Sequence, residues 1–538
     1  MKLTRKQFLK GGAASLGVLG IGMRAAPAAT TVPGRIVGAT SALGHRLRNG
    51  GFPAPGRTVK TDIVIVGAGI AGLGAGYQLS RNGVTDFLVL DLEAAPGGNA
   101  SSGRNAVSAY PWGAHYVPLL TAEARAVHAL FEDFGIITGH DEKGLPIYDE
   151  YALCADPQER LYRYGRWQDG LVPSTGIRPG DEADYKRFFG AMEVFRQRKD
   201  ASGRRAFAIP LDLSSQDADL LALDAISMDA WLKQEGYTSP ELAWYINYCC
   251  RDDYGTPSAE TSAWAGIHYF AARNGRAANT DPQSLVTWPE GNGYLAGRLA
   301  APLAAQLRTS TLAYAVRRDG ETVIVEAWDD AKQASLRIEA KAAILATPHF
   351  VTGRLLGTGP AAEGPSYAPW AIANITLDRL PGGRGVELCW DNVIQESPLL
   401  GYVNATHQVT QMKPVSTVLT YYWPLSHLDP AEARRQALAR SLEEWQNIFL
   451  GELLRIHPEL TDHVQSMDVW IWGHAMVRPV PGFIWGATRR AMLEQAPPIF
   501  TAHSDMSGNS LFEEAYTHGV IAAENVLRFR NLPFRSVL

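Results

Sequence analysis

Residues 61–98, TDIVIVGAGIAGLGAGYQLSRNGVTDFLVLDLEAAPGG, decide the fold of this chain. They read as a β-branched strand, a glycine-rich turn, a helix, and a second strand that ends on an acidic residue. This order matters more than the glycines alone, because glycine-rich turns are common in proteins. A strand, a helix and a second strand in succession predict an α/β fold built on a buried parallel sheet.

Three glycines mark the opening of the helix in this stretch. Gly67, Gly69 and Gly72 form a GxGxxG spacing. The first permits a tight turn, the second lets backbone N–H groups approach a pyrophosphate, and the third allows the helix to pack closely on the strand. Asp91 ends the second strand, where a carboxylate can accept hydrogen bonds from an adenosine ribose. The stretch therefore predicts a dinucleotide site, with the diphosphate at the helix N-terminus.

Length and composition narrow the class of protein. A chain of 538 residues is long enough for two packed domains. Its net charge of −5 and the absence of a basic block argue against a nucleic-acid partner. Cys154, Cys249, Cys250 and Cys389 lack metal-ligand spacing, so we expect buried apolar cysteines and no metal site. No later segment has the apolar length to span a bilayer, so stable membrane insertion is not expected.

The first residues predict an export signal. MKLTRKQFLK is basic, the next twelve residues are mildly apolar, and Ala26-Pro27-Ala28 offers a small-residue cleavage site. Residues 4–10 resemble the twin-arginine export motif, with a lysine in place of the second arginine. We therefore expect a signal over residues 1–28 and a periplasmic or secreted protein. Residues 29–57, rich in Gly, Pro and Arg, are expected to form a linker or a strap.

The rest of the chain predicts two interleaved domains. Residues 312–346 indicate a β-meander and a buried return strand of the kind that completes a large dinucleotide-binding sheet. Residues 140–285 mix short helical runs with aromatic-rich loops. The expected cofactor-binding pieces are 58–118, 286–350 and 486–538, and the expected substrate-side pieces are 119–285 and 351–485.

Three separated segments together resemble the FAD-dependent oxidoreductases of the flavin-containing amine oxidase superfamily, which includes protoporphyrinogen oxidases and carotenoid desaturases. The first is GAGIAGLGAG with LVLDLEAAPGG, in which Gly97 and Gly98 fall six and seven residues after Asp91, as the superfamily pattern requires. The second is TWPEGNGYL, residues 287–295, followed by the meander and AILATP. The third is IFTAHSDMSGNSLFEEAYTHGVIAAENV, residues 499–526.

The resemblance implies a two-dinucleotide-binding, Rossmann-like α/β domain that holds FAD and is interleaved with a mixed α+β substrate domain. It implies non-covalent FAD, because the closing segment has no cysteine that could form a thioether link. A helix beginning near residue 511 would direct its N–H groups toward the flavin pyrimidine. The implied cofactor contacts are Gly67, Gly69, Gly72, Asp91, Gly97, Gly98, Gly113, Ala114, Val316, Ser504, Asp505 and Glu513.

Several positions depart from the superfamily pattern. Asn99 stands where an arginine usually follows the glycine pair, and Ser504 takes the position of the usual acid, with Asp505 after it. Asn374 is the best match for the lysine that favours reaction with oxygen in many members, so its presence points toward a dehydrogenase. Leu511 or Phe512 occupies the place of an aromatic residue that guides amines.

Candidate catalytic groups are two histidines in glycine-punctuated loops, His115 and His474, either of which could take a substrate proton. A purely structural role is the alternative for both. Asp252 or Asp253 could bind a cationic amine, although pairing with the neighbouring Arg251 is the favoured interpretation.

The predicted function is hydride removal from a small organic substrate, with an amine as the leading class. Oxygen, a quinone or a cytochrome would then reoxidise the flavin. The alternatives are a carotenoid- or isoprenoid-desaturase-like flavoenzyme, and a flavin-bound accessory protein that does not turn over.

Overall fold

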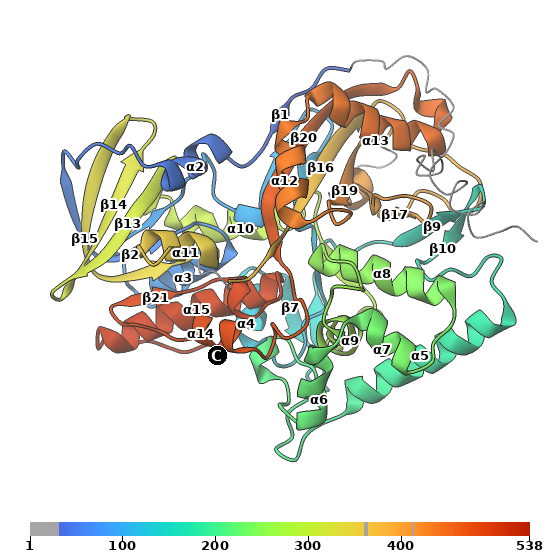
Figure 1. Cartoon of the computed structure of the whole chain (residues 1–538), viewed down its shortest axis with the longest axis horizontal. Coiled ribbons are helices and arrows are strands. Elements are labelled where there is room, and N and C mark those ends of the chain that lie inside the picture. The colour runs from blue at the N-terminus through green and yellow to red at the C-terminus, as the bar shows by residue number, and fades with distance from the viewer. Residues whose placement is uncertain (1–31, 360–363, 411–413) are drawn as a thin grey trace, which may run out of the picture.

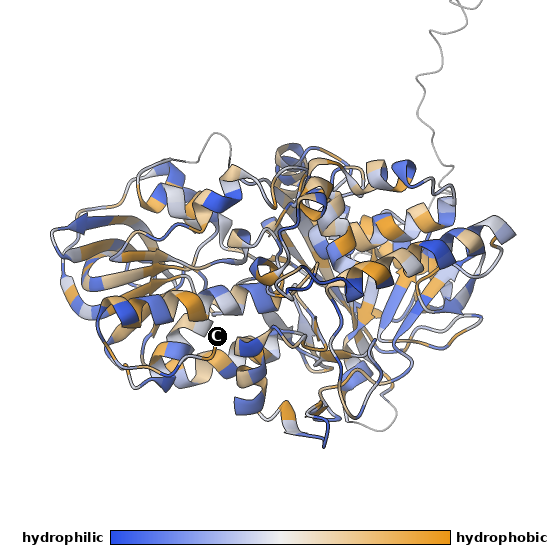
Figure 2. Ribbon diagram, turned by 90° about the horizontal axis from the view of Figure 1, so that it is seen from below, coloured by the Kyte–Doolittle hydropathy of each residue, from blue (hydrophilic) through white to orange (hydrophobic). Residues whose placement is uncertain are grey.

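The computed structural model of the protein describes residues 32–359, 364–410 and 414–538 (Figure 1). The predicted export signal over 1–28 lies outside these residues. Two β-sheets organise the described chain, one on the left of Figure 1 and one on the right. Figure 2 shows apolar residues running through the strands of both sheets.

The first sheet is the dinucleotide-binding sheet, with the strand order β12-β3-β2-β15-β14-β13 and β21 beside β15. Its central strand β2 pairs in parallel with β3 and β15, and β15 pairs in parallel with β21. Side chains alternate across β2, so that Ile63 and Ile65 pack against helices while Val64 and Val66 pack against the meander. The strands are β2 (Thr58–Val66), β3 (Phe87–Leu90), β12 (Leu307–Arg308), β13 (Thr311–Asp319), β14 (Thr322–Asp329), β15 (Ala334–Leu345) and β21 (Ile499–Thr501).

Two helices from opposite ends of the chain cover one face of this sheet. α3 (Ile70–Arg81) follows the glycine-rich turn, and α15 (Phe512–Phe529) ends near the C-terminus. Their backbones come close at Gly519, where an added Cβ would lie 2.2 Å from the carbonyl oxygen of Ala71. Glycine is therefore required at this crossing, and the closing segment is held beside the glycine-rich turn.

Replacing Gly519 by Ala should destabilise the fold by about 1–3 kcal/mol, because the extra carbon forces two packed backbones apart. A matched control is Gly297→Ala in α10 (Gly293–Ala300), where an added Cβ meets no atom within 4 Å. That change should stabilise by about 0.5–1 kcal/mol, since alanine favours helix more than glycine does. Chemical denaturation of both variants measures the two effects, and equal effects would contradict the crossing described here.

The second sheet has the order β1-β20-β16-β19-β18-β17-β9-β10. One of its faces packs against α12 (Pro430–Ala439) and α13 (Leu442–Ile456), and the other packs against a group of helices from the middle of the chain. Figure 1 shows these helices on opposite sides of the sheet. The strands are β1 (Ile36–Val37), β9 (Glu159–Arg163), β10 (Arg166–Asp169), β16 (Tyr367–Leu377), β17 (Asp391–Ile394), β18 (Gly401–Asn404), β19 (Thr417–Pro424) and β20 (Val464–Val477).

The middle of the chain is more helical than the sequence suggested. We expected short helical runs and loops over 140–285, yet α5 (Pro179–Gln197) has 19 residues and begins with a proline and a capping box. In α9 (Ala263–Ala271) the helical period is hidden because nearly every residue is buried, so that no polar face alternates with an apolar one. The helices that follow are α6 (Ala218–Ala222), α7 (Met228–Gln234), α8 (Pro240–Tyr254) and α9 (Ala263–Ala271).

Shorter elements connect the two sheets. The predicted helix over 121–134 is present as α4 (Arg125–Asp133). The remaining elements are α2 (Ser41–Asn49), α11 (His349–Leu355), α14 (Ala487–Met492), β4 (Ser102–Arg104), β5 (Ala109–Pro111), β6 (Tyr116–Pro118), β7 (Ile137–His140), β8 (Pro146–Tyr148) and β11 (Leu285–Thr287).

The expected burial of the cysteines is confirmed. All four cysteines are buried and free. Within the described ranges, no helix combines the length and apolarity needed to cross a bilayer. The same ranges contain no cluster of three or more His, Cys, Asp or Glu side chains arranged to hold a metal ion.

Candidate functional site

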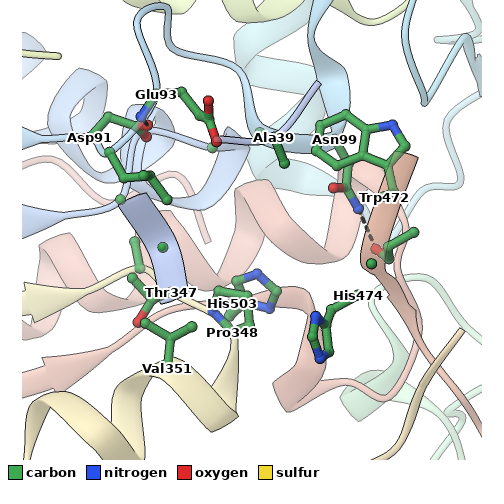
Figure 3. Close-up of a pocket in the computed structure, with 18 of the residues that line it drawn as sticks. Ala39, Asp91, Glu93, Asn99, Thr347, Pro348, Val351, Trp472, His474 and His503 are labelled. Carbon is green, nitrogen blue, oxygen red and sulfur yellow. Dashed lines mark hydrogen bonds between the residues drawn. The ribbon is translucent and has the colours of Figure 1, made fainter. Parts of the chain in front are cut away.

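A long cavity of about 520 Å³ lies between the dinucleotide-binding sheet, the second sheet and the closing segment (Figure 3). We call it the long cavity. It brings together residues that are hundreds of positions apart in the chain. Among the predicted contacts, Gly67, Gly69, Asp91, Gly97, Gly98, Ala114, Ser504 and Asp505 line it.

The glycine-rich turn has the geometry of a phosphate-binding loop. Gly67 has a φ of 101°, and a Cβ at Gly72 would lie 1.8 Å from its carbonyl oxygen. A Cβ at Gly69 would meet only Gly98, at 3.9 Å, so open space lies beside this residue. α3 begins at the next residue without a side-chain cap. Its first N–H groups therefore remain available to an anion in the cavity.

Asp91 and the glycine pair complete this end of the cavity. Asp91 Oδ2 accepts a hydrogen bond from the Ala68 N–H at 2.6 Å, and Oδ1 accepts one from the Glu93 N–H at 2.8 Å. Burial raises the pKa of Asp91 to about 6, although these two donors oppose the shift. The Gly97 N–H donates to the Ala68 carbonyl at 2.9 Å, which holds the glycine pair against the glycine-rich turn.

In the closing segment, Asp505 is held by protein groups. Its Oδ2 accepts hydrogen bonds from the Tyr367 hydroxyl at 2.5 Å and the His349 N–H at 2.9 Å, and its Oδ1 lies 3.0 Å from His503 Nδ1. Burial opposes ionisation, but His503 and these donors outweigh it and lower the pKa of Asp505. Ser504 lines the cavity beside it, and its hydroxyl has no hydrogen-bond partner among the described residues.

A second, short cavity of about 130 Å³ adjoins the long one, and we call it the short cavity. The N-terminus of α15 marks the junction, because Ser510, Leu511 and Phe512 line both cavities. The helix has no side-chain cap at Leu511, so its first N–H groups and positive dipole end are available at the junction. A flat ring bound at this junction would lie between the long cavity and the short cavity.

The short cavity has aromatic walls and a charged end. The aromatic and apolar lining residues are Tyr116, Trp370, Ile372, Tyr422, Trp472, Met476, Leu511 and Phe512. Four charged side chains, Asp252, Asp253, Arg273 and Glu513, also line it. α8 supplies the two aspartates and α15 supplies the glutamate.

The short cavity contains three carboxyl groups and only one guanidinium group. Asp253 forms a buried ion pair with Arg273, and not with Arg251 as the sequence suggested. Arg251 instead donates to the Ser426 hydroxyl at 3.2 Å and to the Pro398 carbonyl, because its side chain leaves the helix on another side. Asp252 and Glu513 have no ion-pair partner among the described residues.

Both unpaired carboxyls titrate near neutral pH. Burial raises the pKa of Asp252 to about 7, and the neighbouring Asp253 charge adds to the shift. Burial likewise raises the pKa of Glu513 to about 7, and its side chain is only 3% exposed. A cation in the short cavity would favour the ionised form of each group. The sequence could not reveal this pair, since only the fold brings α8 and α15 together.

The two predicted catalytic histidines lie in different cavities. His115 lines the short cavity, its ring 4.6 Å from Tyr422, and burial lowers its pKa to about 4. His474 lines the long cavity, stacked on Phe350 at 4.4 Å, and its pKa is lowered to about 4 by burial and by nearby Arg434 and His45. Both imidazoles are neutral at neutral pH and are weak bases there.

Val316, predicted as a cofactor contact, lies in the meander. It is buried in the core of the meander, opposite Val325, and lines neither cavity. The residues of β13 that line the long cavity are Thr311, Leu312 and Ala313, at the start of the strand.

Other predicted positions have different neighbours from those expected. Gly72 packs on the turn and does not line the long cavity, whereas Gly113 and Glu513 line the short one. Asn374 lines neither cavity, because its amide donates to the Pro111 carbonyl at 3.0 Å and accepts from the Thr420 hydroxyl at 2.6 Å. Among the described residues that line the two cavities, there is no lysine.

Comparison with known proteins supports the assignment of the first segment. A family model described as an NAD(P)-binding Rossmann-like domain matches residues 65–134. Chloroplastic protoporphyrinogen oxidase from Oryza sativa subsp. japonica is 43% identical over 60 residues, 11% of each chain. Chloroplastic thiamine thiazole synthase from Arabidopsis thaliana is 42% identical over 128 residues, 22% of this chain and 33% of that protein. The matches thus span only a minor part of the length of these curated relatives.

Comparison with solved structures shows the fold over most of the chain. Putrescine oxidase bound to putrescine matches with a TM-score of 0.62 at 16% identity, covering 88% of this chain and 100% of that one. Cyclohexylamine oxidase from Brevibacterium oxydans IH-35A matches with a TM-score of 0.60 at 14% identity, covering 88% of this chain and 99% of that one. The chain therefore shares the overall α/β fold of these proteins.

Proposed function

We propose that this chain is an FAD-dependent oxidoreductase that removes a hydride from a small cationic amine. One observation carries the proposal: a short cavity with two unpaired carboxyls adjoins a long dinucleotide cavity at an uncapped helix N-terminus. The size of the short cavity suits a small substrate, and its negative charge suits a cation. The fold that the chain shares with two amine oxidases supports amine oxidation by analogy.

The residues of the long cavity fit a bound FAD. The turn at Gly69 has open space for a diphosphate, Asp91 is placed for an adenosine ribose, and Ser504 offers a free hydroxyl. When bound, FAD supplies the two-electron acceptor for the hydride that leaves the carbon next to the amine nitrogen. We propose a non-covalent site, since none of the four cysteines lines either cavity. Flavin that stays attached to His474 after denaturation would overturn that point.

In the short cavity, Asp252 is the group best suited to take a proton from the substrate ammonium. Its pKa of about 7 leaves its carboxylate ionised for much of the time at neutral pH and still basic enough to accept a proton. Glu513 supplies a second negative charge from the first turn of α15. The faces of Tyr422 and Trp370 can contact a cation and exclude water from it. His115, neutral and buried, serves as part of the aromatic wall.

The rate constant kcat/KM for an amine should fall about tenfold to a hundredfold per pH unit well below pH 7, because protonation of Asp252, of Glu513 or of both removes charge that binds the cation. Both groups have pKa values raised to about 7, so the active, ionised form is lost as the pH decreases and is complete above about pH 8. Steady-state kinetics between pH 5.5 and 9 measure this profile. A flat profile below pH 7 would contradict the assigned role of these carboxyls.

The acceptor and the compartment are also proposals. We propose reoxidation by oxygen, a quinone or a cytochrome, in the periplasm or outside the cell. The absence of lysine from the described lining of both cavities supports a dehydrogenase. Mixing the reduced protein with air distinguishes the cases, since slow reoxidation indicates an acceptor other than oxygen. Fractionation of cells that produce the full chain tests the compartment.

Product analysis tests the proposed reaction. The purified protein is incubated with an artificial electron acceptor and panels of amines, amino acids and apolar alkenes, and the mixtures are examined by mass spectrometry. Loss of two hydrogens from an amine, or the corresponding aldehyde, supports the proposal. Turnover of alkenes alone would indicate an isoprenoid-type substrate, and turnover of none would favour an accessory protein.

A further inference from the structure

The segment before the first sheet joins the two halves of the protein. Its first part is bound to the second sheet, where the Val469 N–H donates to the Arg35 carbonyl at 3.0 Å and the Met467 N–H donates to the Pro33 carbonyl at 2.9 Å. Gly34 lies so close to this strand that a Cβ would be 1.9 Å from the Met467 carbonyl oxygen. This end is therefore fixed as an additional parallel strand, β1.

The other end of the segment is fixed to the dinucleotide-binding half. The Thr40 N–H and hydroxyl donate to the Glu93 carboxylate at 2.9 and 2.7 Å. Leu43 is buried against Leu312 and Trp328, and the ring of Phe52 stacks on Tyr314 at 4.2 Å. The segment thus crosses from one half to the other, and Figure 1 shows α2 beside the meander with β1 next to β20.

Between these anchors the segment forms a wall of the long cavity. Its lining residues are Ala39, Thr40, Ser41, Gly44, His45, Leu47 and Arg48. Figure 3 shows Ala39 among the residues that line the cavity. Because β1 and α2 are tied to different halves of the molecule, the wall they form cannot open without breaking one of the anchors.

The segment also adds a positive charge, Arg48, to a cavity that is lined by several carboxylates. Asp91, Glu93 and Asp505 line the long cavity, and a diphosphate would add two more negative charges. Asn99 follows the glycine pair and brings no charge. The arginines that line the cavity are Arg48, Arg354 and Arg434, from α2, α11 and α12. Arg48 is exposed, and its only side-chain partner among the described residues is the amide oxygen of Asn49, so its guanidinium is available to an anion.

We propose that residues 35–52 are a cofactor strap: α2 closes the long cavity over bound FAD, and its attachment to Glu93 sets the rate at which the cofactor leaves. This inference rests on the proposed binding of FAD. It assigns a cofactor role to a segment outside the three motifs that bind the dinucleotide. Cofactor entry then requires release of the Thr40 anchor, followed by closure of the strap.

The test measures FAD release from the purified, loaded protein after dilution, followed by the fluorescence of free flavin. Thr40→Val removes the hydroxyl hydrogen bond to the Glu93 carboxylate, leaves the backbone N–H bond in place, and should accelerate release about tenfold. Arg48→Ala should accelerate release about threefold at low salt and less at high salt, because the charge is exposed. Arg166→Ala, an exposed arginine in β10, is the control and should leave the release rate unchanged.

Thermal unfolding of the apoproteins shows whether the variants are folded. Faster release from Thr40→Val and Arg48→Ala, with unchanged apoprotein unfolding, supports the strap. If Thr40→Val fails to fold, Arg48→Ala still decides, since its side chain is exposed. Unchanged release from folded variants that contain flavin would overturn the strap alone. A wild-type protein that yields no flavin on denaturation would instead overturn the proposed function.

Discussion

Replacing Asp252 by Asn should lower kcat/KM for a cationic amine by a factor on the order of 10²–10³, while the flavin content stays unchanged. Asp252 lines the short cavity and has no ion-pair partner in the described part of the chain, whereas its neighbour Asp253 is paired with Arg273. Removing one partner of a buried charge pair costs about 2–5 kcal/mol, which corresponds to this loss. Stopped-flow reduction of the flavin, together with steady-state kinetics, measures it.

Asp319→Asn is the matched control for the removal of one negative charge. This residue is exposed at the end of β13, and its replacement should leave kcat/KM within twofold of wild type. If Asp252 accepts a proton from the substrate, two further results are expected for Asp252→Asn. Its pH profile should lose one titration step near pH 7, and a neutral substrate analogue should bind with unchanged affinity. Equal losses for the amine and the neutral analogue would indicate a structural role for Asp252.

Replacing Gly69 by Ala should weaken FAD binding by at least about tenfold without destabilising the apoprotein, because only the space beside the turn is filled. Gly69 has a φ of −72°, which alanine adopts freely, and its added Cβ would meet only Gly98 at 3.9 Å. That Cβ would stand beside the first turn of α3, where the diphosphate is expected. Titration of apoprotein with FAD, followed by flavin fluorescence, gives the affinity.

Gly72→Ala separates packing from binding. An added Cβ there would lie 1.8 Å from the Gly67 carbonyl oxygen, so the turn must distort whether or not the cofactor is bound. This variant should lose both thermal stability and FAD binding, whereas Gly69→Ala should lose binding alone. A Gly69→Ala protein that binds FAD as wild type does would exclude the diphosphate from this turn.

The first sheet could be predicted from the sequence because its signals are local. The GxGxxG turn, the following helix and Asp91 lie within one short stretch, and their spacing follows from strand and helix geometry. The closing segment could be placed beside them only through its resemblance to a known pattern. The structure then gave the physical reason, the close crossing of two helices at Gly519.

The features that shape the proposed chemistry depend on contacts between distant residues. Asp252 and Glu513 are 261 positions apart, and nothing local to either residue indicates that both face one cavity. The choice of Arg251 as a partner for an aspartate failed because neighbours in sequence point to different sides of a helix. Which residues of β13 line the long cavity also depends on the fold, and these are Thr311, Leu312 and Ala313 and not Val316.

The most direct test of the central claim is the visible spectrum of the purified protein before and after anaerobic addition of a small primary amine. We expect the absorption of bound oxidised FAD at the start, with about one flavin per chain on denaturation. We expect this absorption to bleach with the amine and not with an apolar alkene. A colourless protein, or flavin that bleaches with the alkene and not with any amine, would contradict the account.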